Sequence, residues 1–127
     1  MLFAGNDLLE IKRIERSMKN PRFLRRVLGS AEYAYLEGRG FPVQSVAASF
    51  SAKEAFSKAV GTGISGFLLT EVELLREPNG RPYLCLSGRA KELADGLNAQ
   101  FAVTVSHTRE YVSVVVVGTD GEAEIKR

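Results

Sequence analysis

A glutamate and a lysine one helical turn apart, Glu54 and Lys58, could together do chemistry on a phosphate group. Their segment, VAASFSAKEAFSKAVGTG, predicts one helix over residues 45–60, with Ser45 as its N-cap and Gly61 as its stop. Residues four apart on a helix point into the same space, so the carboxylate could hold a cation beside an ammonium that holds a phosphate. A surface ion pair is the alternative that this spacing leaves open.

A second carboxylate, Asp7, follows a short apolar segment, residues 2–5, that we expect to form a strand ending at Gly5. Just past a strand end, Asp7 could be a metal ligand or could cap the following helix. Mg²⁺ takes one or two carboxylates together with phosphate oxygens and waters, and Asp7 and Glu54 would fit such a site.

The net charge of +2 is unevenly distributed along the chain. Residues 12–26 hold seven basic side chains and one acid, Glu15, and the remainder of the chain is net negative. This asymmetry predicts an anionic partner for the basic segment, with a merely solvated basic face as the alternative. A non-catalytic module that binds nucleic acid is a second hypothesis, but the segment lacks interleaved exposed aromatic residues and any standard motif.

The length of 127 residues is that of one domain with a real core, and 45% hydrophobic with 25% charged residues is typical of soluble globular proteins. The longest apolar run, residues 114–117, is too short to span a bilayer, and MLFAGND does not have the pattern of a secretory signal. The one cysteine, Cys85, cannot form an internal disulfide, and no Cys/His cluster is suited to zinc. We therefore expect a cytoplasmic protein with no membrane partner.

The remaining pattern predicts an α+β fold in which one antiparallel sheet packs on the long central helix. Strands are expected at residues 2–5, 71–76, 83–86, 101–106 and 111–117, the second and third joined by a turn at Asn79-Gly80. Further helices are expected at residues 8–18, 22–28, 30–36 (with Ser30 as N-cap) and 87–97. The unbroken valines of the last strand suggest burial on both faces, by the core or by a neighbouring subunit. Residues 119–127 are predicted to form a polar tail.

Several separated motifs, GNDLLEIKRI, SFSAKEAFSKAVGTGI, NGRPYL and VTVSHTREYVSVVVV, together resemble the bacterial holo-[acyl-carrier-protein] synthases, the short class of 4'-phosphopantetheinyl transferases. The likeness covers residues 1–118 as a single domain. It implies transfer of the 4'-phosphopantetheine arm of coenzyme A to a serine of apo acyl carrier protein, with release of adenosine 3',5'-bisphosphate, in fatty acid biosynthesis. It also implies the transferase fold, Mg²⁺ as cofactor, no nucleic-acid partner, and a homotrimer with each active site at a subunit interface.

The resemblance assigns roles to particular residues. Asp7 and Glu54 would hold Mg²⁺, Glu54 would take the serine proton directly or through a metal-bound water, and Lys58 would neutralise or protonate the leaving oxygen. The positions matching the family's coenzyme contacts are Lys53, Lys58, Arg81, Pro82, His107 and Thr108. The positions matching its carrier-protein surface are Arg13, Met18, Arg22 and Phe23. Without the resemblance, His107 would be a turn residue and Arg81-Pro82 part of a plain hairpin turn.

Two positions depart from the family pattern: Asn6 stands where relatives usually carry an apolar residue, and Ser49 where they often carry Arg. A cationic contact to the coenzyme is then either absent or supplied by Arg39, Arg81 or another subunit. A degenerate member of the family, which binds coenzyme A without transferring the arm, is a third hypothesis.

Overall fold

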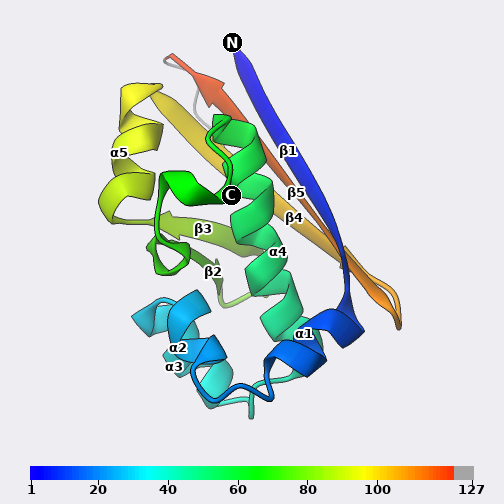
Figure 1. Cartoon of the computed structure of the whole chain (residues 1–127). Helices are drawn as coiled ribbons and strands as arrows, with labels where there is room; N and C mark the ends of the chain where they lie inside the picture. Colours follow the sequence, from blue (N-terminus) through cyan, green and yellow to red (C-terminus); the bar gives the residue numbers. More distant parts are fainter. Residues whose placement is uncertain (122–127) are drawn as a thin grey trace.

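The computed structural model describes residues 1–121 and shows an α+β fold, as predicted (Figure 1). The strands are β1 (Leu2–Glu10), β2 (Val72–Arg76), β3 (Pro82–Leu86), β4 (Ala99–His107) and β5 (Tyr111–Asp120). The helices are α1 (Ile11–Ser17), α2 (Phe23–Val27), α3 (Ser30–Glu37), α4 (Val43–Val60) and α5 (Gly88–Gly96), with short 3-10 turns η1 (Ile64–Gly66) and η2 (Leu69–Glu71). The strands form two antiparallel sheets, β1-β5-β4 and β2-β3, so the prediction of a single sheet was wrong.

Helix α4 crosses one face of the three-stranded sheet, and helices α1 to α3 gather at one end of the molecule (Figure 1). Four small residues on one arc of α4 are buried against the core, namely Ala48, Ala52, Ala55 and Ala59. The helix ends as expected at Gly61, whose φ of 81° is left-handed. It begins at Val43 rather than beyond Ser45, because the amide of Val46 already donates to the carbonyl oxygen of Pro42, the N-cap, at 3.0 Å.

Strand β1 is longer than predicted and pairs with β5 over its whole length, from Leu2 opposite Thr119 to Glu10 opposite Tyr111. The polar pair Asn6 and Asp7 interrupts its apolar pattern, which is why the sequence suggested an end at Gly5. Asp7 therefore lies within the strand and not after it, and the following helix starts only at Ile11.

Strand β5 buries one face of its valine run and leaves the other partly open. Val112, Val114 and Val116 are fully buried, whereas Val117 is 43% exposed. Within one chain, the expected burial on both faces is thus seen on one face only. The strand continues to Asp120, so the polar tail does not begin at Thr119, and residues 122–127 lie outside the described part of the chain.

The basic segment forms α1 and α2 and the turn between them. Helix α3 begins at Ser30 with Gly29 as its N-cap, so the prediction that Ser30 is the cap was wrong by one position. The β2-β3 hairpin has the predicted turn, with Gly80 at φ of 90°. Within residues 1–121, none of the helices has the length and apolar character needed to cross a membrane.

Candidate active site

The backbone of β1 touches the backbone of α4 at Gly5. A Cβ atom placed on Gly5 would lie 2.1 Å from the carbonyl oxygen of Ala55 and 2.6 Å from the amide nitrogen of Ala59. Only glycine fits there, and the alanines of α4 permit the approach. Side chains alternate along a strand, so Asp7, two residues further on, points to the same face as Gly5 and meets the helix.

Two side chains of α4 hold Asp7. The Ser51 hydroxyl donates a hydrogen bond to Asp7 Oδ2 at 2.7 Å, and Lys58 Nζ lies 3.5 Å from Asp7 Oδ1. Lys58 Nζ also donates to the carbonyl oxygen of Asn6 at 3.0 Å. The Lys58 side chain is 53% exposed and that of Asp7 is 14% exposed, so this cluster opens to solvent.

Glu54 lies on the Asp7 side of α4. It comes three residues after Ser51 and four before Lys58, and both of these contact Asp7. At about 100° and 1.5 Å per residue, such positions share one helix face, with Glu54 one turn from each neighbour. Glu54 is half-buried. Strand β1 and helix α4 therefore bring Asp7 and Glu54, the two carboxylates that were expected to share a cation, to one side of α4.

The donor set of this site suits magnesium. Asp7 and Glu54 offer hard carboxylate oxygens, and among residues 1–121 no group of three or more His, Cys, Asp or Glu could hold a metal alone. Mg²⁺ usually completes its octahedron with waters and substrate phosphate oxygens, so two protein carboxylates are sufficient for it.

Lys53 does not belong to this cluster, although the resemblance named it as a coenzyme contact. Its ammonium is fully buried, pairs with Glu32 Oε1 at 2.7 Å and donates to the carbonyl oxygen of Val72. The Glu32 carboxylate also accepts from the amides of Gly29 at 3.2 Å and Leu74 at 2.8 Å. Burial lowers the pKa of Lys53, and the facing charge of Glu32 opposes that shift.

The placement of Lys53 disagrees with the expected anion contact. A fully buried ammonium with two partners has no atom that a phosphate could reach without opening the core. The pair joins α3, α4 and β2, so its role in this structure is to hold these elements together.

The other expected coenzyme contacts lie away from Asp7 within one chain. His107 and Thr108 are at the exposed end of β4, and β5 lies between β4 and β1, about 10 Å across at the usual strand spacing. The Thr108 hydroxyl accepts from the amide of Tyr111 at 3.1 Å and so caps the turn. Arg81 and Pro82 are in the hairpin of the other sheet.

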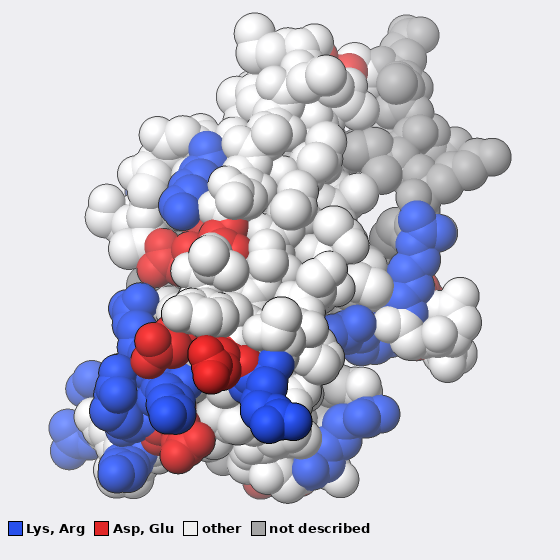
Figure 2. Space-filling view, turned by 90° about the vertical axis from the view of Figure 1, so that its right-hand side faces the viewer, with Lys and Arg blue, Asp and Glu red and all other residues white. Residues whose placement is uncertain are grey.

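Two of the expected carrier-protein residues contact Phe50, which precedes Glu54 by one turn of α4. Arg13 on α1 lies over the ring of Phe50 at 5.6 Å, and Phe23 on α2 stacks on the same ring at 6.2 Å. Met18 and Arg22 lie in the turn between these helices. Figure 2 shows Lys and Arg side chains, with a few acidic ones, at the lower end of this face, where α1 lies in Figure 1, beneath a mostly neutral surface.

The chain matches a known protein family over most of its length. Residues 4–112 match the family model described as the 4'-phosphopantetheinyl transferase superfamily. The chain belongs to this superfamily. It is therefore an enzyme that transfers a phosphorus-containing group, as the motifs had implied.

Individual relatives agree with the family. The chain is 44% identical over 119 residues to a holo-[acyl-carrier-protein] synthase of Moorella thermoacetica, covering 92% of this chain and 93% of the relative. The crystal structure of that enzyme from Neisseria meningitidis matches with a TM-score of 0.86 at 28% identity, over 93% of this chain and 98% of the other. The Helicobacter pylori enzyme in complex with coenzyme A matches with a TM-score of 0.79 at 31% identity, over 91% and 99%.

Sequence reasoning missed three residues of this region: Ser51, which holds Asp7, Glu32, which pairs with Lys53, and Phe50 as the centre of the aromatic cluster. Ser51 precedes Glu54 by three positions, so helix periodicity could have assigned it to the same face. No such local signal exists for Glu32, which is distant in sequence from Lys53 and meets it only through tertiary packing.

Proposed function

We propose that this protein transfers the 4'-phosphopantetheine arm of coenzyme A to a serine of an apo acyl carrier protein, for fatty acid biosynthesis, and releases adenosine 3',5'-bisphosphate. The observation that carries the proposal is Asp7 held against α4 by Ser51 and Lys58, on the side of the helix that bears Glu54. The names of the relatives and the complex of one of them with coenzyme A support the same reaction.

In this proposal the serine hydroxyl attacks the phosphorus that carries the pantetheine arm, and the bond from that phosphorus to the adenylate oxygen breaks. Glu54 takes the proton of the hydroxyl, and Lys58 offsets the negative charge on the leaving oxygen. Asp7 and Glu54 would hold Mg²⁺, which when bound would neutralise charge on the pyrophosphate. The exposed head of Lys58 can leave Asp7 for a substrate oxygen without opening the core.

The carrier protein would dock on the surface around Phe50. Phe50 precedes Glu54 by one helical turn, so a protein bound over Arg13 and Phe23 would present its serine near the proposed base. Acyl carrier proteins are acidic, and the basic α1–α2 segment is complementary to them.

Two observations support assembly into a homotrimer with shared active sites. The face of the three-stranded sheet turned away from α4 exposes apolar side chains, including Leu2 at 77% and Leu8 at 66%. His107 and Arg81 are both apart from Asp7 in one chain, so a coenzyme that contacts all three would need a second subunit. Analytical ultracentrifugation tests this, and a stable monomer with full activity would contradict it.

The test of the proposed reaction is release of adenosine 3',5'-bisphosphate from coenzyme A in the presence of apo acyl carrier protein and Mg²⁺. Glu54→Gln is expected to lower turnover by about 10²–10⁴-fold, the usual contribution of a general base, while the fold stays intact. Glu92→Gln, on the exposed side of α5, is the matched control and should retain full activity. Near-full activity of Glu54→Gln would show that the proposed base is wrong.

Two competing functions predict other results. A degenerate member would bind coenzyme A in a calorimetric titration without releasing the bisphosphate. A nucleic-acid-binding module would bind RNA or duplex DNA at moderate salt through residues 12–26, which we do not expect of the transferase.

A further inference from the structure

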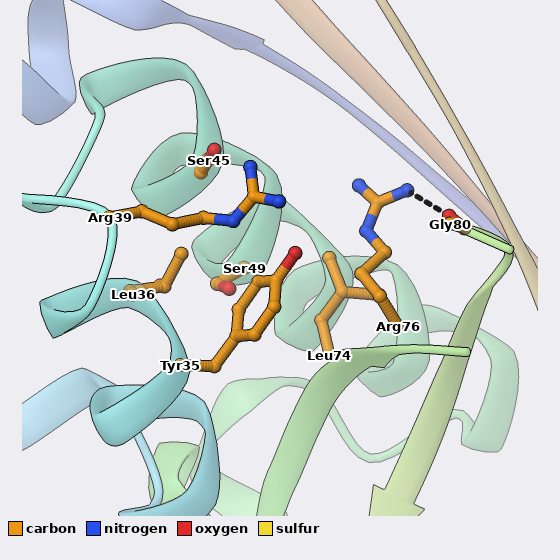
Figure 3. Close-up of a pocket in the computed structure, with 8 residues that line it drawn as sticks. All are labelled: Tyr35, Leu36, Arg39, Ser45, Ser49, Leu74, Arg76 and Gly80. Carbon is orange, nitrogen blue, oxygen red and sulfur yellow. Dashed lines mark hydrogen bonds between the residues drawn. The ribbon is translucent and has the colours of Figure 1, made fainter. Parts of the chain in front are cut away.

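The buried serines of helix α4 make different contacts. Ser49, which is 2% exposed, lines the pocket of about 240 Å³ shown in Figure 3. The Ser57 hydroxyl donates at 2.6 Å to the backbone carbonyl oxygen of Glu54, a local bond that serines inside helices commonly make. Ser51 has no exposed surface, and its hydroxyl instead donates across to β1, to Asp7 Oδ2, at 2.7 Å. A buried hydroxyl is therefore directed at one of the two proposed metal ligands.

The contact between β1 and α4 keeps Ser51 against Asp7. The backbone of Gly5 lies so close to the helix that a Cβ atom there would be 2.1 Å from the carbonyl oxygen of Ala55. Asp7 follows Gly5 on the same face of the strand, and Ser51 precedes Ala55 by one helical turn. Because the two backbones touch and Ser51 is closed to solvent, water cannot replace the hydroxyl at Oδ2.

The two oxygens of the Asp7 carboxylate are therefore not equivalent. Oδ2 accepts from the buried Ser51 hydroxyl, whereas Oδ1 faces Lys58 Nζ at 3.5 Å. The Lys58 side chain is 53% exposed, and an exposed ammonium can leave a carboxylate at little cost. Oδ1 is thus the oxygen that an arriving cation can take, while Oδ2 keeps its hydrogen bond.

We propose that Ser51 is a positioning residue that restricts Asp7 to binding a divalent cation through Oδ1 alone and thereby favours Mg²⁺ over Ca²⁺. This inference rests on the magnesium site of the proposed function. Mg²⁺ requires near-ideal octahedral geometry, in which a carboxylate can contribute a single oxygen. Ca²⁺ is larger and takes about six to eight oxygens, which can include both oxygens of one carboxylate.

The O–H dipole of Ser51 opposes a cation at Oδ2. A Ca²⁺ ion bound through both oxygens of Asp7 would share Oδ2 with the hydroxyl hydrogen, which cannot turn away into water. A Mg²⁺ ion on Oδ1 meets no such conflict, and the hydrogen bond holds the carboxylate in one orientation for it. If Ser51 only joined β1 to α4, its loss would weaken the binding of both ions alike.

The experiment titrates Mg²⁺ or Ca²⁺ into the full chain at saturating coenzyme A and measures both affinities by calorimetry. Ser51→Ala is the test variant. Ser57→Ala is the matched control, because Ser57 is a buried serine of the same helix whose hydroxyl reaches a backbone carbonyl and not a carboxylate. Alanine is smaller than serine and favours the helix, and circular dichroism verifies that both variants fold.

We expect Ser51→Ala to lower the preference for Mg²⁺ over Ca²⁺ by about threefold to tenfold, up to the contribution of one hydrogen bond to a charged group. Ser57→Ala should keep the preference of the wild type. In crystals grown with Ca²⁺, we expect the ion to contact both oxygens of Asp7 in Ser51→Ala and one oxygen in the wild type.

The outcomes separate this inference from the proposed function. An unchanged preference in Ser51→Ala, even with weaker binding of both ions, would overturn the inference and leave the proposed function standing. Ca²⁺ on both oxygens of Asp7 in the wild type would overturn it in the same way. If the wild type binds neither ion, the magnesium site of the proposed function is wrong, and the inference is wrong with it.

Discussion

Helix α4 carries two lysines five residues apart, and each faces a carboxylate in a different setting. Lys53 and Glu32 are both fully buried, with 2.7 Å between Nζ and Oε1. Lys58 and Asp7 are 3.5 Å apart, and more than half of the Lys58 side chain is exposed. Each pair joins a lysine to a carboxylate, Glu32 in one and Asp7 in the other, and the two pairs differ most in burial and geometry.

The difference separates a structural pair from a pair that can react. Around Lys53, the carbonyl of Val72 and the backbone amides that bind Glu32 satisfy the charged groups and leave no room for a ligand. Around Lys58, the ammonium can exchange Asp7 for a substrate phosphate at little cost, because exposed ion pairs contribute only about 0–1 kcal/mol. The exposed pair of Lys58 and Asp7, here called the open pair, therefore suits catalysis. The buried pair of Lys53 and Glu32, the closed pair, suits stability.

The largest effect is expected from breaking the closed pair. Lys53→Met leaves the Glu32 carboxylate buried without its counter-charge, and we expect the free energy of unfolding to fall by about 3–5 kcal/mol. Urea denaturation measures this loss. Adding Glu32→Gln to Lys53→Met removes the uncompensated charge and should recover part of it, whereas no recovery would contradict the ion-pair explanation.

The same substitution in the open pair should act on catalysis instead. We expect Lys58→Met to change unfolding free energy by less than about 1 kcal/mol. Its turnover should fall by about 10²–10³-fold, the usual loss when one group that stabilises developing charge is removed. Steady-state kinetics of bisphosphate release measure the fall. Equal losses of stability in Lys53→Met and Lys58→Met would mean that the two pairs do not differ as described.

A smaller effect is expected where β1 meets α4. Gly5→Ala would force the strand away from Ala55 and Ala59, with an expected cost of about 1–3 kcal/mol for overpacking. The shift would also carry Asp7 away from Ser51 and lower turnover. Gly96→Ala is the matched control, because a Cβ there meets nothing within 4 Å. Crystallography of Gly5→Ala would show the shift, and an unmoved β1 with full activity would refute it.

The smallest effect concerns the proposed carrier-protein surface. Arg13→Gln removes one charge above Phe50 and should raise the KM for apo acyl carrier protein about threefold to tenfold while leaving kcat unchanged, because charges at the edge of an interface mainly affect encounter. The difference from wild type should shrink as salt is raised. Lys91→Gln on α5 is the control. If neither Arg13→Gln nor added salt changes the KM for apo acyl carrier protein, the carrier protein docks elsewhere on the enzyme.

Local patterns in the sequence predicted helices α2 to α5 and the β2-β3 hairpin well, since signals such as Gly61 and Asn79-Gly80 act over a few residues. The extent of β1 could not be predicted, because its polar Asn6 and Asp7 are kept in the strand by pairing with β5. The motifs predicted the superfamily to which the chain belongs. Helix periodicity correctly predicted that Glu54 and Lys58 share one face of α4.

The burial of Lys53 was beyond local reasoning. Helix periodicity places it near the core face, but whether a lysine there is paired depends on Glu32, which comes from another helix. The pocket at Ser49 is likewise a product of packing, because Arg39 and Arg76 belong to segments that only the fold brings together.

The most direct test of the account is whether Asp7 and Glu54 act as one unit on a bound magnesium ion. Calorimetry would measure the affinity for coenzyme A with and without Mg²⁺ in the wild type, Asp7→Asn, Glu54→Gln and the double variant. We expect Mg²⁺ to raise wild-type affinity about tenfold or more, and either single substitution to remove the whole gain, with no further loss in the double variant. A gain that survives either substitution would contradict a shared site.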